Sequence, residues 1–549
     1  MHPGYYDRYG DIGNFDATVP LSGRVIYPQG KQGLLAQGYL ASANACDADG
    51  VTNTNNAVIN GAPCMQVVGN LSAGFPSGLK QYPHLRFMPR FGFAFRPTSN
   101  DNWVIRGGAG VYNINMLGSS FYSLTGTIQA YTQFFNNTYN TATHAIGYQW
   151  PQIDQGSGGN GCTTCYGTDY FGTANSTNWV DPYTEQWSLS VDHDFGNGYA
   201  GRISYIGSET HHLVWAPDEN TLPFSSTVSA YNQPLSARLF PNWGTINNRD
   251  TSANASYNSL QLEADHRLQR GLEYHSTFSW AKALSDAQGP AGTGFAGEGG
   301  GARATSILDR HADFGNVYGT RRLLWNTTLL YDLPIGRGKL LGSSMPRAAD
   351  LAVGGWRISS ILTVETGPWE TPYFPGGQGD PSGTGSGLSS SLAGWSPPGR
   401  SQHPDHLTGV SMYPAGKNRF NWVNAGAFTC PGYSAWTVGT PCTTGSGFDK
   451  NGNPNGPVPL PIGRFGNTQV GSVEGPGLFN LSAGIGKTFS ITEHLKLEAE
   501  GTFTNVLNHT NLGDPTMNLS SPSFGLVAGT IGSDFGGART GQIAVRAEF

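Results

Sequence analysis

The chain has 549 residues, and its 31 basic and 37 acidic side chains give a formal net charge of −6, with no Lys/Arg cluster of the kind that binds nucleic acid. Only 12% of the residues are charged, while there are 78 glycines and 34 prolines. This composition excludes a helix-rich enzyme and a charged disordered chain, and it suits many strands joined by turn-rich loops. No run approaches the roughly 18 apolar residues of a membrane helix.

The first 88 residues contain no clear strand pattern. They are rich in Gly, Asn and Ala and hold one pair of cysteines. The segment Met1–Asp7 lacks the basic start and the apolar stretch of a signal peptide. We therefore expect the chain to lack its natural beginning, and we expect residues 1–88 to be a loop region that precedes the first complete strand.

From residue 89 onward, segments of about ten residues alternate apolar and polar side chains, which indicates strands with one apolar and one polar face. In one of them Leu260 and Leu262 alternate with Gln261 and Glu263. The predicted strands are 89–97, 103–113, 184–195, 199–209, 257–268, 271–282, 322–332, 356–366, 479–489, 494–507 and 538–549. Such alternation is typical of a strand that lies between lipid and a wet lumen.

The connections alternate between short and long. The short ones are 98–101, 196–198, 269–270 and 490–493, with the intermediate link 333–355 in the same series, and the long ones are 114–183, 210–256, 283–321, 367–478 and 508–537. Short turns on one side and long loops on the other are the anatomy of an antiparallel transmembrane β-barrel with long extracellular loops. Single-chain bacterial barrels have even strand numbers, so eleven strands predict about half of a 22-stranded barrel, an all-β fold.

Several short stretches carry a family resemblance when they are taken in order. They are 89–96, 106–112, 205–208, 331–339, 355–359, 465–467, 475–477 and 503–509. With these stretches the chain resembles the C-terminal barrel part of TonB-dependent outer-membrane receptors of the Oar-like type, which are common in acidobacteria. The terminal strand, with Ile543 and Val545 on one face and Phe549 at its end, resembles the signal that the barrel-assembly machinery reads.

The resemblance implies a protein of the cell outer membrane in contact with its lipid. It implies residues 89–549 as the C-terminal half of the receptor barrel, importing an unknown ligand such as an oligosaccharide or a peptide when complete. The signal peptide, N-terminal β-sandwich and plug of such receptors are not recognisable, so the TonB complex would act only through missing N-terminal parts. A truncated product, a mis-called start and a split receptor all stay open. The alternative is a β-rich surface adhesin or carbohydrate-binding protein without transport activity.

The six cysteines form three close pairs in loop-like sequence: Cys46 with Cys64, Cys162 with Cys165, and Cys430 with Cys442. Even number and local pairing favour disulfides in an oxidising compartment. Cys162 and Cys165 also form a CxxC, but no second ligand pair accompanies it, so a zinc site is the weaker interpretation.

Other motifs favour structural interpretations. The Glu209–His212 run lies at a predicted strand end, where neighbouring histidines should face opposite ways. Asp309, His311 and Asp313 precede a strand, and Asp449–Asn455 lacks the Gly and Glu of a calcium loop. We expect no catalytic residues, no metal and no cofactor, and hence no enzyme. Loop tryptophans Trp395, Trp422 and Trp436 are candidates for stacking on a ligand.

Overall fold

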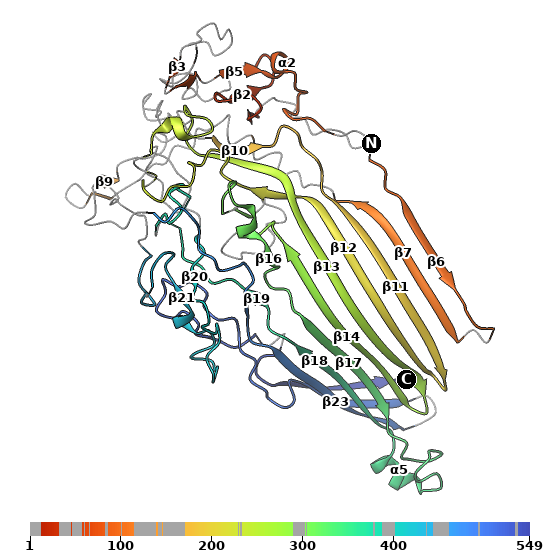
Figure 1. Cartoon of the computed structure of the whole chain (residues 1–549). Helices are drawn as coiled ribbons and strands as arrows, with labels where there is room; N and C mark the ends of the chain where they lie inside the picture. The colour runs from red at the N-terminus through yellow and green to blue at the C-terminus, as the bar shows by residue number, and fades with distance from the viewer. Residues whose placement is uncertain are drawn as a thin grey trace.

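The chain builds one large curved sheet with irregular loops gathered at one of its ends (Figure 1). The computed structural model describes residues 12–31, 46, 58–59, 61–64, 66–82, 86–99, 102–114, 124, 139–140, 145–146, 171–228, 230, 233–288, 302–303, 305–376, 379–386, 401–434, 436–442, 461–491, 495–532 and 536–549.

The main path of the sheet has eleven strands in the described part of the chain, and each is antiparallel to its neighbours. In chain order they are β6 (Arg90–Phe95), β7 (Trp103–Asn113), β11 (Tyr183–Gly196), β12 (Tyr199–Ala216), β13 (Ile246–Gln269), β14 (Leu272–Ser285), β17 (Leu323–Asp332), β18 (Trp356–Glu365), β23 (Leu478–Ser490), β24 (Lys496–Thr504) and β25 (Thr540–Glu548). These are the eleven strands that the alternation predicts, and the all-β antiparallel fold is confirmed.

The register of the strands pairs apolar side chains with apolar ones and charged side chains with charged ones. Ile203 of β12 pairs with Leu262 of β13, and Leu262 pairs with Phe278 of β14. One residue away, Arg202 pairs with Glu263. Because side chains alternate between faces along a strand, the sheet has one apolar wall and one polar wall. We call them the outer wall and the inner wall.

Tight turns close one end of the sheet. Between β13 and β14 only Arg270 and Gly271 remain, with φ of 52° and 84°. A Cβ on Gly271 would lie 2.6 Å from the carbonyl oxygen of Asp332, so both the positive φ and the close approach require glycine. The longer link between β17 and β18 holds α5 (Arg347–Val353) and lies at this same end (Figure 1).

The strands extend beyond the predicted bounds at the other end. β12 runs to Ala216, and β13 starts at Ile246, eleven residues before the predicted start. The prediction that 210–256 forms one long loop is therefore wrong at both ends. These extensions rise above the apolar band, and with no lipid face they show no regular alternation of apolar side chains.

Short additional strands lie at the long-loop end. They are β1 (Asn14–Asp16), β2 (Arg24–Tyr27), β3 (Val58–Ile59), β4 (Ala62–Pro63), β5 (Gln66–Gly69), β8 (Tyr139–Asn140), β9 (Ala145–Ile146), β10 (Phe171–Asn175), β15 (Ala302–Arg303), β16 (Gly315–Asn316), β19 (Trp369–Glu370), β20 (Asp405–His406), β21 (Phe428–Thr429) and β22 (Val473–Glu474). The short helices are α2 (Asn70–Ala73), η4 (Leu235–Ala237), η5 (Arg310–Asp313) and η6 (Ala425–Ala427). Among the described residues, none of the helices combines the length and the apolar character needed to cross a membrane.

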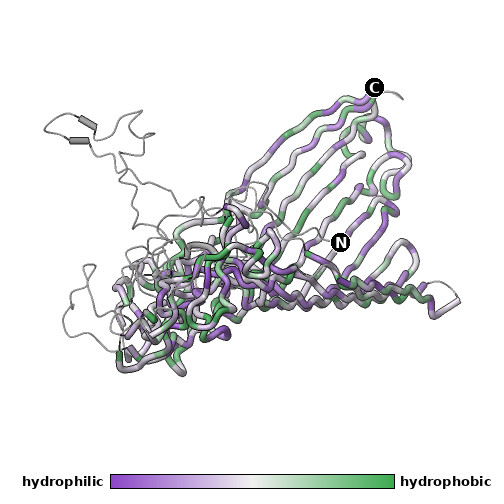
Figure 2. Tube along the Cα trace, turned by 90° about the horizontal axis from the view of Figure 1, so that it is seen from above, coloured by the Kyte–Doolittle hydropathy of each residue, from purple (hydrophilic) through white to green (hydrophobic). Residues whose placement is uncertain are grey.

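Among the apolar clusters of the described residues, the two largest hold much of the loop region together. In the first, Phe15 packs edge-on against Phe240 and Trp243, and the Trp243 indole N–H donates to the Ser22 carbonyl at 2.8 Å. The described stretches 12–31 and 66–69 thus pack against residues 240–246 of the long-loop end. The second cluster joins residues of 373–442 to 473 and 517–524, with Phe374, Phe428 and Leu519 almost fully buried. Seen from above, the loops form one mass beside the fan of strands (Figure 2).

Candidate functional site: the inner wall of the sheet

The inner wall carries a belt of paired charges near the short-turn end. Asp192 accepts hydrogen bonds from Arg106 on one neighbouring strand and from Arg202 on the other. Arg202 also reaches Glu263, with 3.1 Å between Nη1 and Oε2. Charge therefore runs across four adjacent strands, and each carboxylate has a cationic partner.

The belt continues on the later strands with separate pairs. His275 Nδ1 contacts Asp265, and Arg357 donates to Asp332 at 2.6 Å. The side chains of all these residues are partly exposed in the open sheet. A charged surface of this kind needs water or a polar partner against it, so this wall cannot face hydrocarbon.

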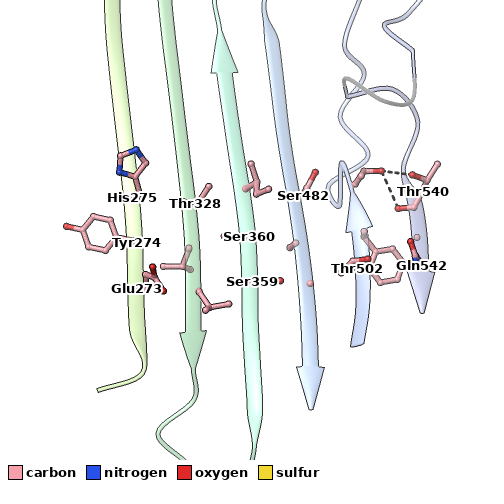
Figure 3. A pocket seen from close by; sticks show the side chains of 18 residues that line it. Glu273, Tyr274, His275, Thr328, Ser359, Ser360, Ser482, Thr502, Thr540 and Gln542 are labelled. Atoms are coloured by element: carbon pink, nitrogen blue, oxygen red, sulfur yellow. Dashed lines mark hydrogen bonds between the residues drawn. The ribbon is translucent and has the colours of Figure 1, made fainter. Parts of the chain in front are cut away.

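A groove rich in hydroxyl groups lies beside the belt, where the sheet curves most strongly. Its volume is about 630 Å³, and it crosses six strands from β14 to β25. Its inner-wall side chains are Glu273, His275, Thr328, Leu330, Ser359, Ile361, Ser482, Thr502, Thr504, Thr540 and Gln542. Figure 3 shows the row of short polar side chains along the strands, with Thr504 bonded to Thr540 across β24 and β25.

The groove offers many weak hydrogen-bonding groups and only two titratable ones, Glu273 and His275. Short Ser and Thr side chains keep the surface open and can donate or accept, so they suit contact with neutral polar solutes or with another polar protein surface. Ile361 adds an apolar spot that is 53% exposed. Among these described residues no groove hydroxyl is hydrogen-bonded to the His275 imidazole, whose Nδ1 contacts Asp265, so no nucleophile–base pair is formed there.

The outer wall is apolar and aromatic. Phe91, Leu189, Ile203 and Ile543 are all exposed large apolar side chains on it. Near the short-turn end aromatic rings meet across strands, as in the group of Tyr199, His266 and Tyr274. A broad apolar band edged by aromatic rings is the form of a lipid-facing surface.

Lys487 lies in the row of the outer wall near the short-turn end. Lys487 is 6% exposed, and its ammonium donates to the carbonyls of Ala352 and Gly354 at 2.8 and 2.7 Å. The ammonium also lies 4.7 Å from the centre of the Trp356 ring. The side chain reaches the short-turn end and leaves its stem in the apolar layer, so this charge does not contradict a lipid-facing wall.

The cap formed by the second apolar cluster has one well-defined ion pair. Arg464 donates to both oxygens of Asp405 at 2.7 and 2.8 Å. Burial alone would raise the pKa of Asp405, but hydrogen bonds from Arg464 and from the N–H groups of Gly432 and Asn467 outweigh it and hold that pKa below its usual range. These contacts tie together three stretches of loop, around residues 405, 432 and 464–467.

The structure gives two of the candidate tryptophans a packing role. Trp422 donates to the Glu474 carbonyl at 3.1 Å, and the Lys417 ammonium covers its ring at 4.6 Å. Trp436 packs edge-on against Phe374 with 5.0 Å between ring centres. Both rings are partly exposed, so stacking on a ligand stays a prediction for them, and Trp395 lies outside the described residues.

Cys46 and Cys64 are joined with 4.8 Å between their Cα atoms, and Cys430 and Cys442 with 5.5 Å. Cys162 and Cys165 lie outside the described residues. Phe549 is 98% exposed at the end of the last strand.

The histidine pair at 211–212 differs from the expectation of opposite faces. His212 has φ of 61°, and the register shifts there, which marks a bulge in β12. Because of the bulge both imidazole rings lie near Tyr183, with ring centres 5.3 and 5.8 Å away. His211 contacts Asn254 and His212 contacts the Thr251 carbonyl.

Asp313 is fully buried and accepts from the Thr305 N–H at 2.8 Å and from the Trp215 indole at 3.3 Å. His311 instead stacks beside Phe314. The two groups therefore do not form an acid–base pair. No group of three or more His, Cys, Asp or Glu side chains placed to hold a metal occurs in the described part of the chain, and the whole 449–455 segment lies outside it. The charged belt and the bulge are features that sequence reasoning did not find, although the alternation of Arg and Asp across strands was a signal for the belt.

Solved outer-membrane proteins share features with this sheet at low similarity. The outer membrane transporter YddB from Escherichia coli is 10% identical with a TM-score of 0.38, over 84% of this chain and 40% of that one. The ferric preacinetobactin receptor BauA from Acinetobacter baumannii is 7% identical with a TM-score of 0.34, over 84% and 36%. The FrpB iron transporter from Neisseria meningitidis is 10% identical with a TM-score of 0.33, over 84% and 39%. The chain thus spans well under half the length of each.

No curated protein sequence matches the chain. The sequence signature of one family does match, over residues 1–542. With its lipid-compatible outer wall and its polar inner wall, the chain belongs to the outer membrane beta barrel domain family, and its place is the outer membrane.

Proposed function

We propose that this chain supplies eleven strands, the C-terminal half, of the barrel of a TonB-dependent receptor of the Oar-like type. When complete, that receptor imports a ligand such as an oligosaccharide or a peptide. The observation that carries the proposal is the antiparallel sheet with an apolar outer wall, a charged and hydroxyl-rich inner wall, and two edges, β6 and β25, that pair with no further strand of the described residues. Eleven strands are half of the 22 found in large plugged outer-membrane transporters.

The free edges are the physical reason to expect a second half. Backbone N–H and C=O groups without partners cost several kcal/mol each in lipid. An open sheet would also expose its charged belt to hydrocarbon. In the proposed receptor, residues 1–88 and the long loops lie on the extracellular side. Coupling to TonB goes through a plug that belongs to the rest of the receptor.

Site-specific photo-crosslinking in cells tests this proposal. A photoreactive residue at Ala94 of β6 or at Ala544 of β25 should crosslink to another barrel segment. The matched control at Ser188, in the middle of the sheet on β11, should not. Crosslinks only between the two edges of one chain would show that eleven strands close on themselves and would overturn the proposal.

Extraction and uptake complete the test. The chain should need detergent to leave the membrane, whereas a surface adhesin washes off in high salt. Cells carrying only this chain should show no saturable uptake that depends on TonB. Such uptake by this chain alone would contradict the proposal that the plug and the contact with TonB belong to the rest of the receptor.

A further inference from the structure

A second groove lies on the outer wall, at the end of the sheet that carries the long loops. Its volume is about 590 Å³. Tyr205, Leu260 and Trp280 line its lower part, and they are 43%, 36% and 56% exposed. Lys282 and Arg322 also line it. The groove therefore combines an apolar floor with two cationic side chains.

The depth of these groups follows from strand geometry. Lys282 lies ten residues along β14 from Leu272 at the short-turn end. At about 3.4 Å per residue and a tilt of about 45°, it stands about 24 Å above that end. The apolar band of an outer-membrane barrel is about 25 Å tall. Lys282 thus lies at the level where acyl chains give way to lipid headgroups, and Trp280 lies just below it.

Among the described residues at this level, Lys282 makes no ion pair, whereas Arg322 makes a long one with Glu474. Lys282 is exposed, and no hydrogen bond or ion pair engages its ammonium in the part of the chain that the structure describes. Arg322 is half-exposed, and its nearest carboxylate, Glu474, is 3.5 Å away. Asn258 accepts from the Tyr205 hydroxyl at 2.6 Å, which orients its amide and leaves the NH₂ group to donate.

Arg322 reaches the outer wall because the start of β17 is irregular. The N–H groups of Arg322 and Leu323 both donate to the Thr366 hydroxyl at 3.1 Å. Neighbouring Arg321 pairs with Glu365 instead, which is an inner-wall residue by its register with Leu324. The irregularity therefore places Arg322 on the same wall as the next residue, Leu323, and sends Arg321 to the inner wall.

We propose that this groove binds an anionic lipid of the outer leaflet. The phosphate lies between Lys282, Arg322 and the Asn258 amide, and an acyl chain lies along Leu260 and Trp280. Two cations against one nearby carboxylate give a net positive site, and the apolar floor below them favours a lipid over a free anion. The inference requires only that the outer wall faces lipid, so it does not depend on transport.

Native mass spectrometry of the detergent-extracted full chain tests the site, with phosphatidic acid as the anionic probe and phosphatidylcholine as the neutral one. We expect selective retention of phosphatidic acid. Each of Lys282→Ala and Arg322→Ala should weaken its binding about fivefold, and the double variant about 25-fold. Lys282→Arg should keep most of the affinity, because it keeps the charge.

The control is the double variant Arg267→Ala with Lys496→Ala, which removes two exposed cations on the inner wall near the short-turn end. It should bind phosphatidic acid as the parent does. Equal losses in both double variants would show a general charge effect and overturn the site, as would equal retention of the two lipids. Displacement of the lipid by millimolar inorganic phosphate would show a simple phosphate site and also overturn it. Circular dichroism of each variant checks that the sheet is intact.

Discussion

The assignment of the two walls makes a sharp prediction for adjacent residues of β13. Leu262 is 39% exposed on the outer wall, between Ile203 and Phe278. Gln261 lies on the inner wall between Ser204 and Ser279. We expect Leu262→Lys to destabilise the membrane-inserted chain strongly and Gln261→Lys to change its stability little.

The magnitude follows from depth. Leu262 lies seven residues before the end of β13 at Gln269. That places it about 17 Å above the short-turn end of an apolar band about 25 Å tall, within about 5 Å of the midplane. A lysine facing lipid at the midplane costs about 2–4 kcal/mol, and the cost falls toward the interfaces, so we expect about 2–3 kcal/mol. On the inner wall the new ammonium stays in water near Glu263, and the change should stay below about 1 kcal/mol.

Urea titration of the chain inserted in phospholipid vesicles, followed by tryptophan fluorescence, measures both variants. In a soluble sheet Leu262 would be an ordinary exposed side chain, and its replacement would change stability by only about 0.5 kcal/mol. Similar midpoints for the two variants would therefore refute the wall assignment. A loss in the Gln261 variant alone would show that the walls are reversed.

Three further predictions concern the long-loop end. Asp405→Ala should destabilise the cap by about 2–4 kcal/mol, because it leaves two backbone N–H groups and the Arg464 guanidinium without their acceptor. Limited proteolysis should then cleave the cap earlier, and unchanged cleavage would contradict the role of the Asp405–Arg464 pair. Burial and the nearby Asp514 carboxylate raise the pKa of Glu370 from 4.5 to about 8. The folded chain therefore holds a proton that the unfolded chain releases, and stability declines as the pH rises from about 4.5 to about 8; in thermal melts Glu370→Gln should stabilise more at pH 8 than at pH 4.5, and an equal gain at both would contradict this. Replacing Cys430 and Cys442 by serine should cost about 2–4 kcal/mol, since the bond closes a short loop of sequence separation 12; equal proteolysis of the reduced and oxidised chain would show that the bond adds nothing.

The sheet was predictable from sequence because its two environments impose a period of two. Wherever a strand crosses the apolar band, as at Leu260 and Leu262, every second residue must be apolar, and the pattern gives both the strand and its wall. The same pattern gave the eleven strands and the short-turn end. Above the band this constraint disappears. The extension of β13 from Ile246 to Ser256 and the bulge at His212 therefore left no alternation to detect.

The groove and the cap were harder to predict for a related reason. The hydroxyl-rich groove takes one or two residues from each of six strands, so no stretch of sequence contains it. The cap depends on contacts between distant loops, such as Asp405 with Arg464. The contacts of Trp422 with Lys417 and of Trp436 with Phe374 were likewise not predicted from sequence, and stacking of these rings on a ligand stays a prediction.

The directions of the two edge strands restrict how the barrel can close. An antiparallel path of eleven strands starts and ends with strands that run the same way, so β6 and β25 both run toward the short-turn end. If the sheet closed on itself, these edges would meet as a parallel pair. Two copies in the same orientation would also meet through parallel pairs, β25 of one against β6 of the other. An all-antiparallel barrel, as in single-chain bacterial proteins, instead needs a partner sheet with an odd number of strands whose edges both run toward the long-loop end. The free edges therefore fit a complementary half better than a second copy of this chain, and crosslinks from Ala94 and Ala544 should lead to that half.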